Sequence, residues 1–79
     1  MVSRTYTILL DPDFEEGGYT VTVPALPVCV TQGETLEDSI AMAKDAIRCH
    51  INGLIKDGEP IPEEDERPQL ITVDVDVAA

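Results

Sequence analysis

The strongest pattern in the sequence is one apolar stripe that repeats every three or four residues through the middle of the chain. At about 100° per residue its members share one side of a helix, and that side must pack against something. Thr35 suits a helix N-cap, with Asp38 as its capping-box acid, and Gly58 followed by Pro60 is a stop signal. The sequence therefore predicts a helix over residues 36–57. The stripe consists of Leu36, Ile40, Ala43, Ile47, Ile51 and Leu54.

Two segments before this helix alternate with a period of two, which is typical of strands. They are residues 4–10, where Tyr6, Ile8 and Leu10 share a face, and residues 19–23, where the valines face one way and the threonines the other. The segment between them contains a proline and two glycines, which favour a turn. The pattern predicts an antiparallel hairpin.

Two further strands are predicted on either side of the helix. A short one covers residues 28–31, after two prolines that interrupt the sheet ladder. The other covers residues 70–77, where apolar residues alternate with Thr72 and two aspartates, the pattern of a guarded edge strand. Residues 59–68 hold three prolines and many acids, so they are expected to be a solvated connector without packing.

The order of these elements is β-β-β-α-β, and 79 residues allow one small domain covering residues 1–79. We expect an α+β fold of two layers, with the helix on one face of a small mixed sheet. A crossover through the helix should be right-handed if the strands beside it are parallel. The opposite face of the sheet has no helix, which favours dimerisation or docking of a partner.

The chain is strongly acidic, with 16 Asp and Glu against five Lys and Arg and a formal net charge of −11. Nucleic-acid binding needs clustered basic residues, and an anionic membrane repels acidic proteins, so neither partner is expected. The predicted partner is a basic protein. Seven acidic side chains without neighbouring bases are the predicted contact residues: Asp11, Asp13, Glu15, Glu16, Glu63, Glu64 and Asp65.

One segment, residues 17–33, contains no charged residue. Prolines interrupt it, and it is shorter than the roughly 20 apolar residues that a membrane crossing needs. It is better explained as strand surface buried in the core or against another chain. No signal-peptide core is visible near the N-terminus, so a cytoplasmic location with reduced thiols is expected.

Catalytic and metal sites are poorly supported by the sequence. The acidic turn lacks the spacing of a calcium loop, and Asp11, Asp74 and Asp76 lack the mid-strand partner that two-metal nuclease chemistry would require. Cys49 and His50 are adjacent on the predicted helix and therefore diverge by about 100°, which discourages a nucleophile pair. The sequence predicts no enzyme, no metal site and no cofactor.

Several motifs resemble those of one known family, the HicB-type antitoxins of type II toxin–antitoxin systems. They are Gly-Gly-Tyr at 17–19, Pro-x-Leu-Pro at 24–27, and Thr-x-Gly-Glu-Thr-x-Glu at 31–37, which opens the predicted helix. The resemblance covers nearly the whole chain and continues through residues 58–62. Val28 stands where the family usually has glycine, so the turn there should avoid positive φ.

The resemblance implies a partial ribonuclease-H-like fold without that enzyme's catalytic acids. It also implies a homo-oligomeric antitoxin, dimer or tetramer, that binds and silences a small basic mRNA-cleaving toxin of the HicA type. Longer members carry a C-terminal DNA-binding domain, and this chain resembles the short form without it. The alternative left open is a stand-alone module that only associates with itself.

Overall fold

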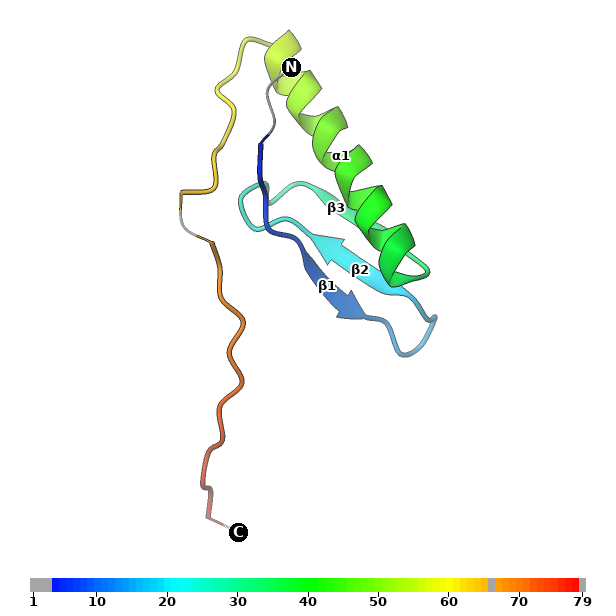
Figure 1. Ribbon diagram of the computed structural model, residues 1–79, viewed down its shortest axis with the longest axis vertical. Coiled ribbons are helices and arrows are strands. Elements are labelled where there is room, and N and C mark those ends of the chain that lie inside the picture. The colour runs from blue at the N-terminus through cyan, green and yellow to red at the C-terminus, as the bar shows by residue number, and fades with distance from the viewer. Residues whose placement is uncertain (1–3, 66, 79) are drawn as a thin grey trace.

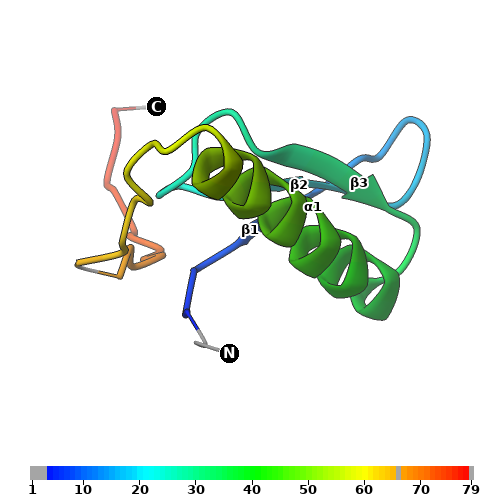
Figure 2. The same cartoon turned by 90° about the horizontal axis from the view of Figure 1, so that it is seen from above.

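The computed structural model describes residues 4–65 and 67–78. Its elements follow the order β1 (Leu9–Pro12), β2 (Tyr19–Thr22), β3 (Val30–Gly33) and α1 (Leu36–Lys56). The three strands form one antiparallel sheet, and α1 lies along one side of it (Figures 1 and 2). The predicted α+β class is therefore confirmed.

The predicted hairpin is present, but its first strand begins later than expected. Leu10 pairs with Val21, and Leu9 pairs with Thr22, in the antiparallel register of β1 and β2. Extending that register would place Thr7 opposite Pro24, which has no N–H to donate. The ladder stops before that point, and residues 4–8 continue alongside α1 outside the sheet (Figure 1).

The third strand is displaced from the expected residues 28–31 to Val30–Gly33. Two backbone hydrogen bonds hold the preceding segment in successive turns, from the Leu26 N–H to the Val23 carbonyl and from the Cys29 N–H to the Leu26 carbonyl. The chain cannot be extended until these turns are complete. Val28 avoids positive φ, as expected from its β-branched side chain.

The helix matches the prediction to within one residue at its C-terminal end. The Thr35 hydroxyl accepts a hydrogen bond from the Asp38 N–H at 3.0 Å, and the Asp38 carboxylate accepts one from the Glu34 N–H at 2.9 Å. At the other end, Gly58 has φ +69°, and the N–H of Glu59 donates to the Leu54 carbonyl, as in a Schellman motif. Local capping therefore sets both ends.

The core lies between the sheet and α1. The side of α1 that faces it is narrower than the apolar stripe predicted from the sequence. The centre of the core is Val23, Leu26 and Cys29, against which four half-buried residues pack. The helix approaches through small side chains, Ser39 and Ala43, while part of the predicted stripe stays exposed. The four packing residues are Tyr6, Ile8, Ala46 and Ile47. The uncharged segment 17–33 supplies all three central residues, which confirms that part of it forms core, while Val28 and Val30 of the same segment stay exposed.

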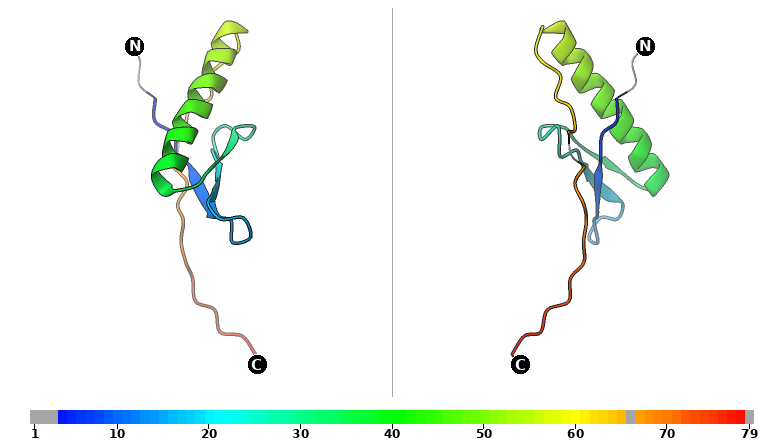
Figure 3. Two further views of the ribbon diagram at one scale, coloured as in Figure 1. Left: turned by 90° about the vertical axis from the view of Figure 1, so that its right-hand side faces the viewer. Right: turned by 60° about the vertical axis from the view of Figure 1, so that its left-hand side comes forward.

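The expected fourth strand is not formed. Residues 70–77 are extended and exposed, belong to no sheet, and lead away from the helix and the strands (Figures 1 and 3). The expected mixed sheet is likewise wrong, because each strand pair in the described part of the chain is antiparallel. The reason lies just before this tail, where contacts with residues 4–7 hold the connector and direct the chain past the sheet.

Candidate interaction surfaces

The acidic turn between β1 and β2 is held by its own hydrogen bonds. The Asp13 carboxylate accepts the backbone N–H groups of Glu15 at 3.0 Å and Glu16 at 3.1 Å. The Asp13 N–H donates to the Gly18 carbonyl, which closes the hairpin. One carboxylate is thus partly used within the turn, while Asp11, Glu15 and Glu16 are exposed.

This turn borders a shallow hollow of about 310 Å³ at the N-terminal end of α1. Four of the side chains that line it are acidic: Asp13, Glu16, Glu34 and Asp38. We call it the acidic hollow. It can accept a basic side chain from another protein, because carboxylates approach it from two separate elements.

Glu34 and Asp38 were not among the predicted contact residues. They reach the hollow because β2 pairs with β3, which places Tyr19 opposite Gly33. The approach is close: a Cβ on Gly18 would lie 2.5 Å from the Gly33 carbonyl oxygen. The signal for this cluster was the register of β2 with β3, which brings residues 13–18 beside the start of the helix.

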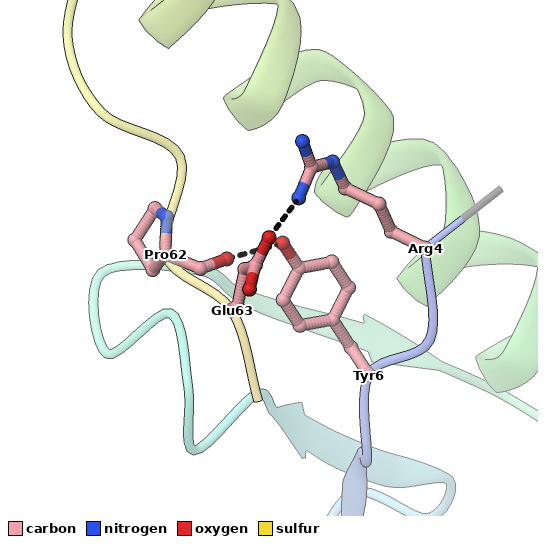
Figure 4. A network of polar contacts seen from close by, with 4 residues as sticks. All are labelled: Arg4, Tyr6, Pro62 and Glu63. Carbon is pink, nitrogen blue, oxygen red and sulfur yellow. Dashed lines mark hydrogen bonds and ion pairs between the residues drawn. The ribbon is translucent and has the colours of Figure 1, made fainter. Parts of the chain in front are cut away.

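The second predicted group lies on the connector and is largely engaged with the N-terminal segment. Arg4 forms an ion pair with Glu63 at 3.2 Å, and the Tyr6 hydroxyl donates to the Pro62 carbonyl (Figure 4). Glu64 is only 4% exposed and accepts two hydrogen bonds from Thr7. The expectation of a connector without packing is therefore wrong.

The two predicted acidic groups do not form one surface. The connector lies on one side of the sheet and the β1–β2 turn on the other in both Figure 1 and Figure 2. On the connector, Glu63 and Asp65 are exposed, whereas the Glu64 carboxylate is nearly buried and hydrogen-bonded to Thr7. The acidic hollow thus gathers more acidic residues from separate elements, and three of them, Glu16, Glu34 and Asp38, are exposed.

Residues with catalytic or metal-binding potential are dispersed. Among residues 4–65 and 67–78, no group of three or more His, Cys, Asp or Glu side chains could hold a metal ion. His50 is half-buried and Cys49 exposed on α1, as the spacing predicted. Burial raises the pKa of the Cys29 thiol, and the charge on Cys49 raises it further, so Cys29 is poorly suited to act as a nucleophile.

Among the described residues, no helix combines the length and the apolar character that a bilayer crossing requires.

Comparison with known proteins identifies a family. A family model described as "HicB_like antitoxin of bacterial toxin-antitoxin system" matches residues 6–76. A UPF0150 protein of Thermoplasma acidophilum is 46% identical over 59 residues, covering 75% of this chain and 84% of that protein.

Two relatives are named as antitoxins. Antitoxin HicB 1 of Photorhabdus laumondii is 42% identical over 57 residues, and Antitoxin HicB of Escherichia coli K12 is 39% identical over 57 residues. Each alignment covers 72% of this chain, but only 36% and 41% of the two relatives. The matched region is thus less than half of either named antitoxin.

Proposed function

This chain belongs to the HicB-like antitoxin family, and on that basis we propose that it is a non-catalytic antitoxin that binds and neutralises a small basic ribonuclease toxin of the HicA type in the cytoplasm. The observation that carries the proposal is the acidic hollow, which four acidic residues from the turn and the helix start line together. An mRNA-cleaving protein must present basic residues to phosphates, so its surface is complementary to this one.

The charge of the chain supports the same role at longer range. A formal net charge of −11 on 79 residues attracts a basic partner before contact, which accelerates association. Once bound, carboxylates of the antitoxin occupy the positions that RNA phosphates would take. This masking requires no chemistry on the antitoxin.

Charge reversal in the acidic hollow tests the proposal. The protein is co-expressed with any small basic protein that is encoded beside its gene, and complex formation is measured by pull-down and calorimetry. The pair of substitutions Glu16→Lys and Glu34→Lys should weaken binding by about tenfold or more, roughly 1.4 kcal/mol. Raising the salt concentration should weaken the unmodified complex as well, because the Debye length falls to about 3 Å at 1 M.

Two matched variants locate the contact. Glu63→Lys with Asp65→Lys makes the same charge change on the connector, and Asp57→Lys with Glu59→Lys makes it beyond the helix C-terminus. Only the first pair, in the hollow, should restore RNA cleavage by the toxin. If all three pairs of substitutions weakened binding equally, the effect would come from the net charge of the protein and not from the hollow. No complex and no toxin neutralisation would reject the antitoxin role.

A second candidate is a module that associates only with itself. The exposed apolar side chains of residues 70–77 favour it, because isolated extended segments of this kind tend to pair with other chains. A stable oligomer that ignores basic ribonucleases would support this candidate. The partial ribonuclease-H-like description also remains a proposal, since it needs a fourth strand beside the three observed.

A further inference from the structure

The C-terminal tail, residues 70–77, exposes one apolar side to solvent. Its apolar residues alternate with Thr72, Asp74 and Asp76, so they share one side of the extended chain. Val75, in the middle of this side, is 72% exposed. This alternation is typical of a β-strand, yet the segment pairs with no strand in the described part of its own chain. The other apolar residues on this side are Ile71, Val73 and Val77.

An apolar groove of about 1030 Å³ runs between residues 4–8 and α1. Ile55, one of its lining residues, is 59% exposed, and so is available to an incoming apolar side chain. Lys44 and Arg48 also line the groove. Its apolar lining comes mainly from Ile8, Ile40, Ile47, Ile51, Ile55 and Ile61.

The tail and the groove are complementary in three respects. Both are apolar, and they carry charges of opposite sign, Asp74 and Asp76 on the tail and Lys44 and Arg48 along the groove. When the apolar side of the tail enters the groove, the two aspartates lie on its outer side, so these charges attract the tail at longer range and form no ion pairs on the groove floor. The groove is also bordered by residues 4–8, which belong to no strand and can lie against an added strand. The pairing therefore covers apolar surface on both partners and brings charges of opposite sign nearer to one another.

The tail of the same molecule does not occupy this groove. Contacts of Tyr6 with Pro62 and of Thr7 with Glu64 hold the connector beside the N-terminal segment. Beyond them the tail leads away from α1 in Figure 1 and in both views of Figure 3. The molecule reaches 56 Å along its longest axis. A tail that leads away from its own helix and sheet is placed to reach another copy.

We propose that residues 70–77 of one copy lie as a strand in the groove of a second copy, and that the exchange is reciprocal. Each copy then supplies one tail and one groove, so a two-fold dimer closes with both apolar surfaces covered. The occupant of the groove is a second copy of this chain. This proposal does not depend on a toxin partner.

Matched tail variants test the proposal by sedimentation equilibrium of the full chain. Val75→Asp places a charge on the apolar side, and Thr72→Asp places the same charge on the other side. The first should raise the dimer dissociation constant by about tenfold or more, and the second should change it by less than about threefold. Circular dichroism checks that the helix is retained in both.

A mixing experiment separates exchange from other modes of association. Ile55→Asp damages the groove, with Ala41→Asp as an exposed helix control, and Val75→Asp damages the tail. Each damaged variant alone should be mainly monomeric. Mixed together they should form heterodimers, because one intact tail then meets one intact groove.

Three results would overturn the proposal. One is a chain that stays monomeric up to high micromolar concentration. Another is a dimer that Val75→Asp and Thr72→Asp weaken equally. The third is slow amide exchange of residues 70–77 that is independent of protein concentration, because that would place the tail in the groove of its own chain.

Discussion

The carboxylate of Glu64 accepts two hydrogen bonds from Thr7, one from its backbone N–H at 2.7 Å and one from its hydroxyl at 2.9 Å. The two residues are 57 positions apart in the sequence. Glu64 is 4% exposed, so water does not replace these bonds easily. This contact ties the connector to the N-terminal segment and determines where the C-terminal tail departs.

The first prediction concerns this contact. Glu64→Ala removes a charged acceptor from a nearly buried position and leaves the Thr7 N–H without its partner. Hydrogen bonds to charged groups contribute about 1.5–3 kcal/mol, so the free energy of unfolding should fall by about 2 kcal/mol. For a domain of this size, the melting temperature should fall by roughly 8–16 °C. Chemical and thermal denaturation measure both quantities.

The neighbouring Glu63 provides the control. Its side chain is 70% exposed and forms one ion pair with Arg4. Exposed pairs contribute about 0–1 kcal/mol, so Glu63→Ala should have a much smaller effect. Equal destabilisation by the two substitutions would mean that burial of Glu64 has no energetic consequence.

The helix could be predicted from the sequence because its signals are local. Thr35, Asp38 and Gly58 set its ends through contacts within a few residues. The hairpin was predicted for the same reason, since its turn residues adjoin the strands they connect. The strand ends were less accurate, because they depend on other segments: the start of β1 on Pro24, which follows β2, and the start of β3 on the turns that precede it.

The connector and the tail could not be predicted in this way. The bond between Glu64 and Thr7 has no local pattern, and the many acids around Glu64 favoured a solvated segment. The alternation in residues 70–77 correctly indicates an extended segment with one apolar side, but periodicity does not say which sheet it joins. Of the four acidic residues in the hollow, Asp13 and Glu16 were predicted as contact residues. Glu34 and Asp38 were not, because they reach the hollow only through the pairing of β2 with β3.

A second prediction concerns Gly33, where the helix start meets β3. A Cβ at this position would lie 2.4 Å from the Ser39 Oγ and 2.5 Å from the Ser39 Cα. Backbone atoms must shift to relieve this overlap, so Gly33→Ala should cost about 3 kcal/mol of unfolding free energy. Urea denaturation measures the loss.

Gly53 is the matched control, because a Cβ there would meet nothing within 4 Å. It lies inside α1, where alanine is favoured over glycine by about 0.8–1 kcal/mol. Gly53→Ala should therefore stabilise the protein. Destabilisation by both alanines would contradict the packing described at Gly33.

A third prediction concerns the start of α1. Thr35→Ala removes the hydroxyl that accepts the Asp38 N–H, and should lower the unfolding free energy by about 1 kcal/mol. Thr35→Ser retains a hydroxyl and should retain most of the stability. If serine and alanine were equally destabilising, the lost contribution would come from the threonine methyl group. Thermal denaturation followed by circular dichroism distinguishes the two results.

The last prediction concerns the pH dependence of stability. Burial raises the pKa of Cys29 above that of a thiol in the unfolded chain, and the charge on Cys49 raises it further. The folded protein therefore holds this proton more tightly than the unfolded chain does. The resulting stabilisation is fully present below the unfolded pKa of about 8.5 and is lost as the pH rises from there through the folded pKa.

Urea denaturation between pH 7 and pH 10 measures this loss. Cys29→Ala lowers stability at every pH by removing a core side chain, but its stability should decline less than the wild type's above about pH 8.5. Cys49→Ser should reduce the decline only slightly, because burial is the larger cause of the shift. A constant difference between wild type and Cys29→Ala across this range would mean that the buried thiol and the unfolded thiol share one pKa.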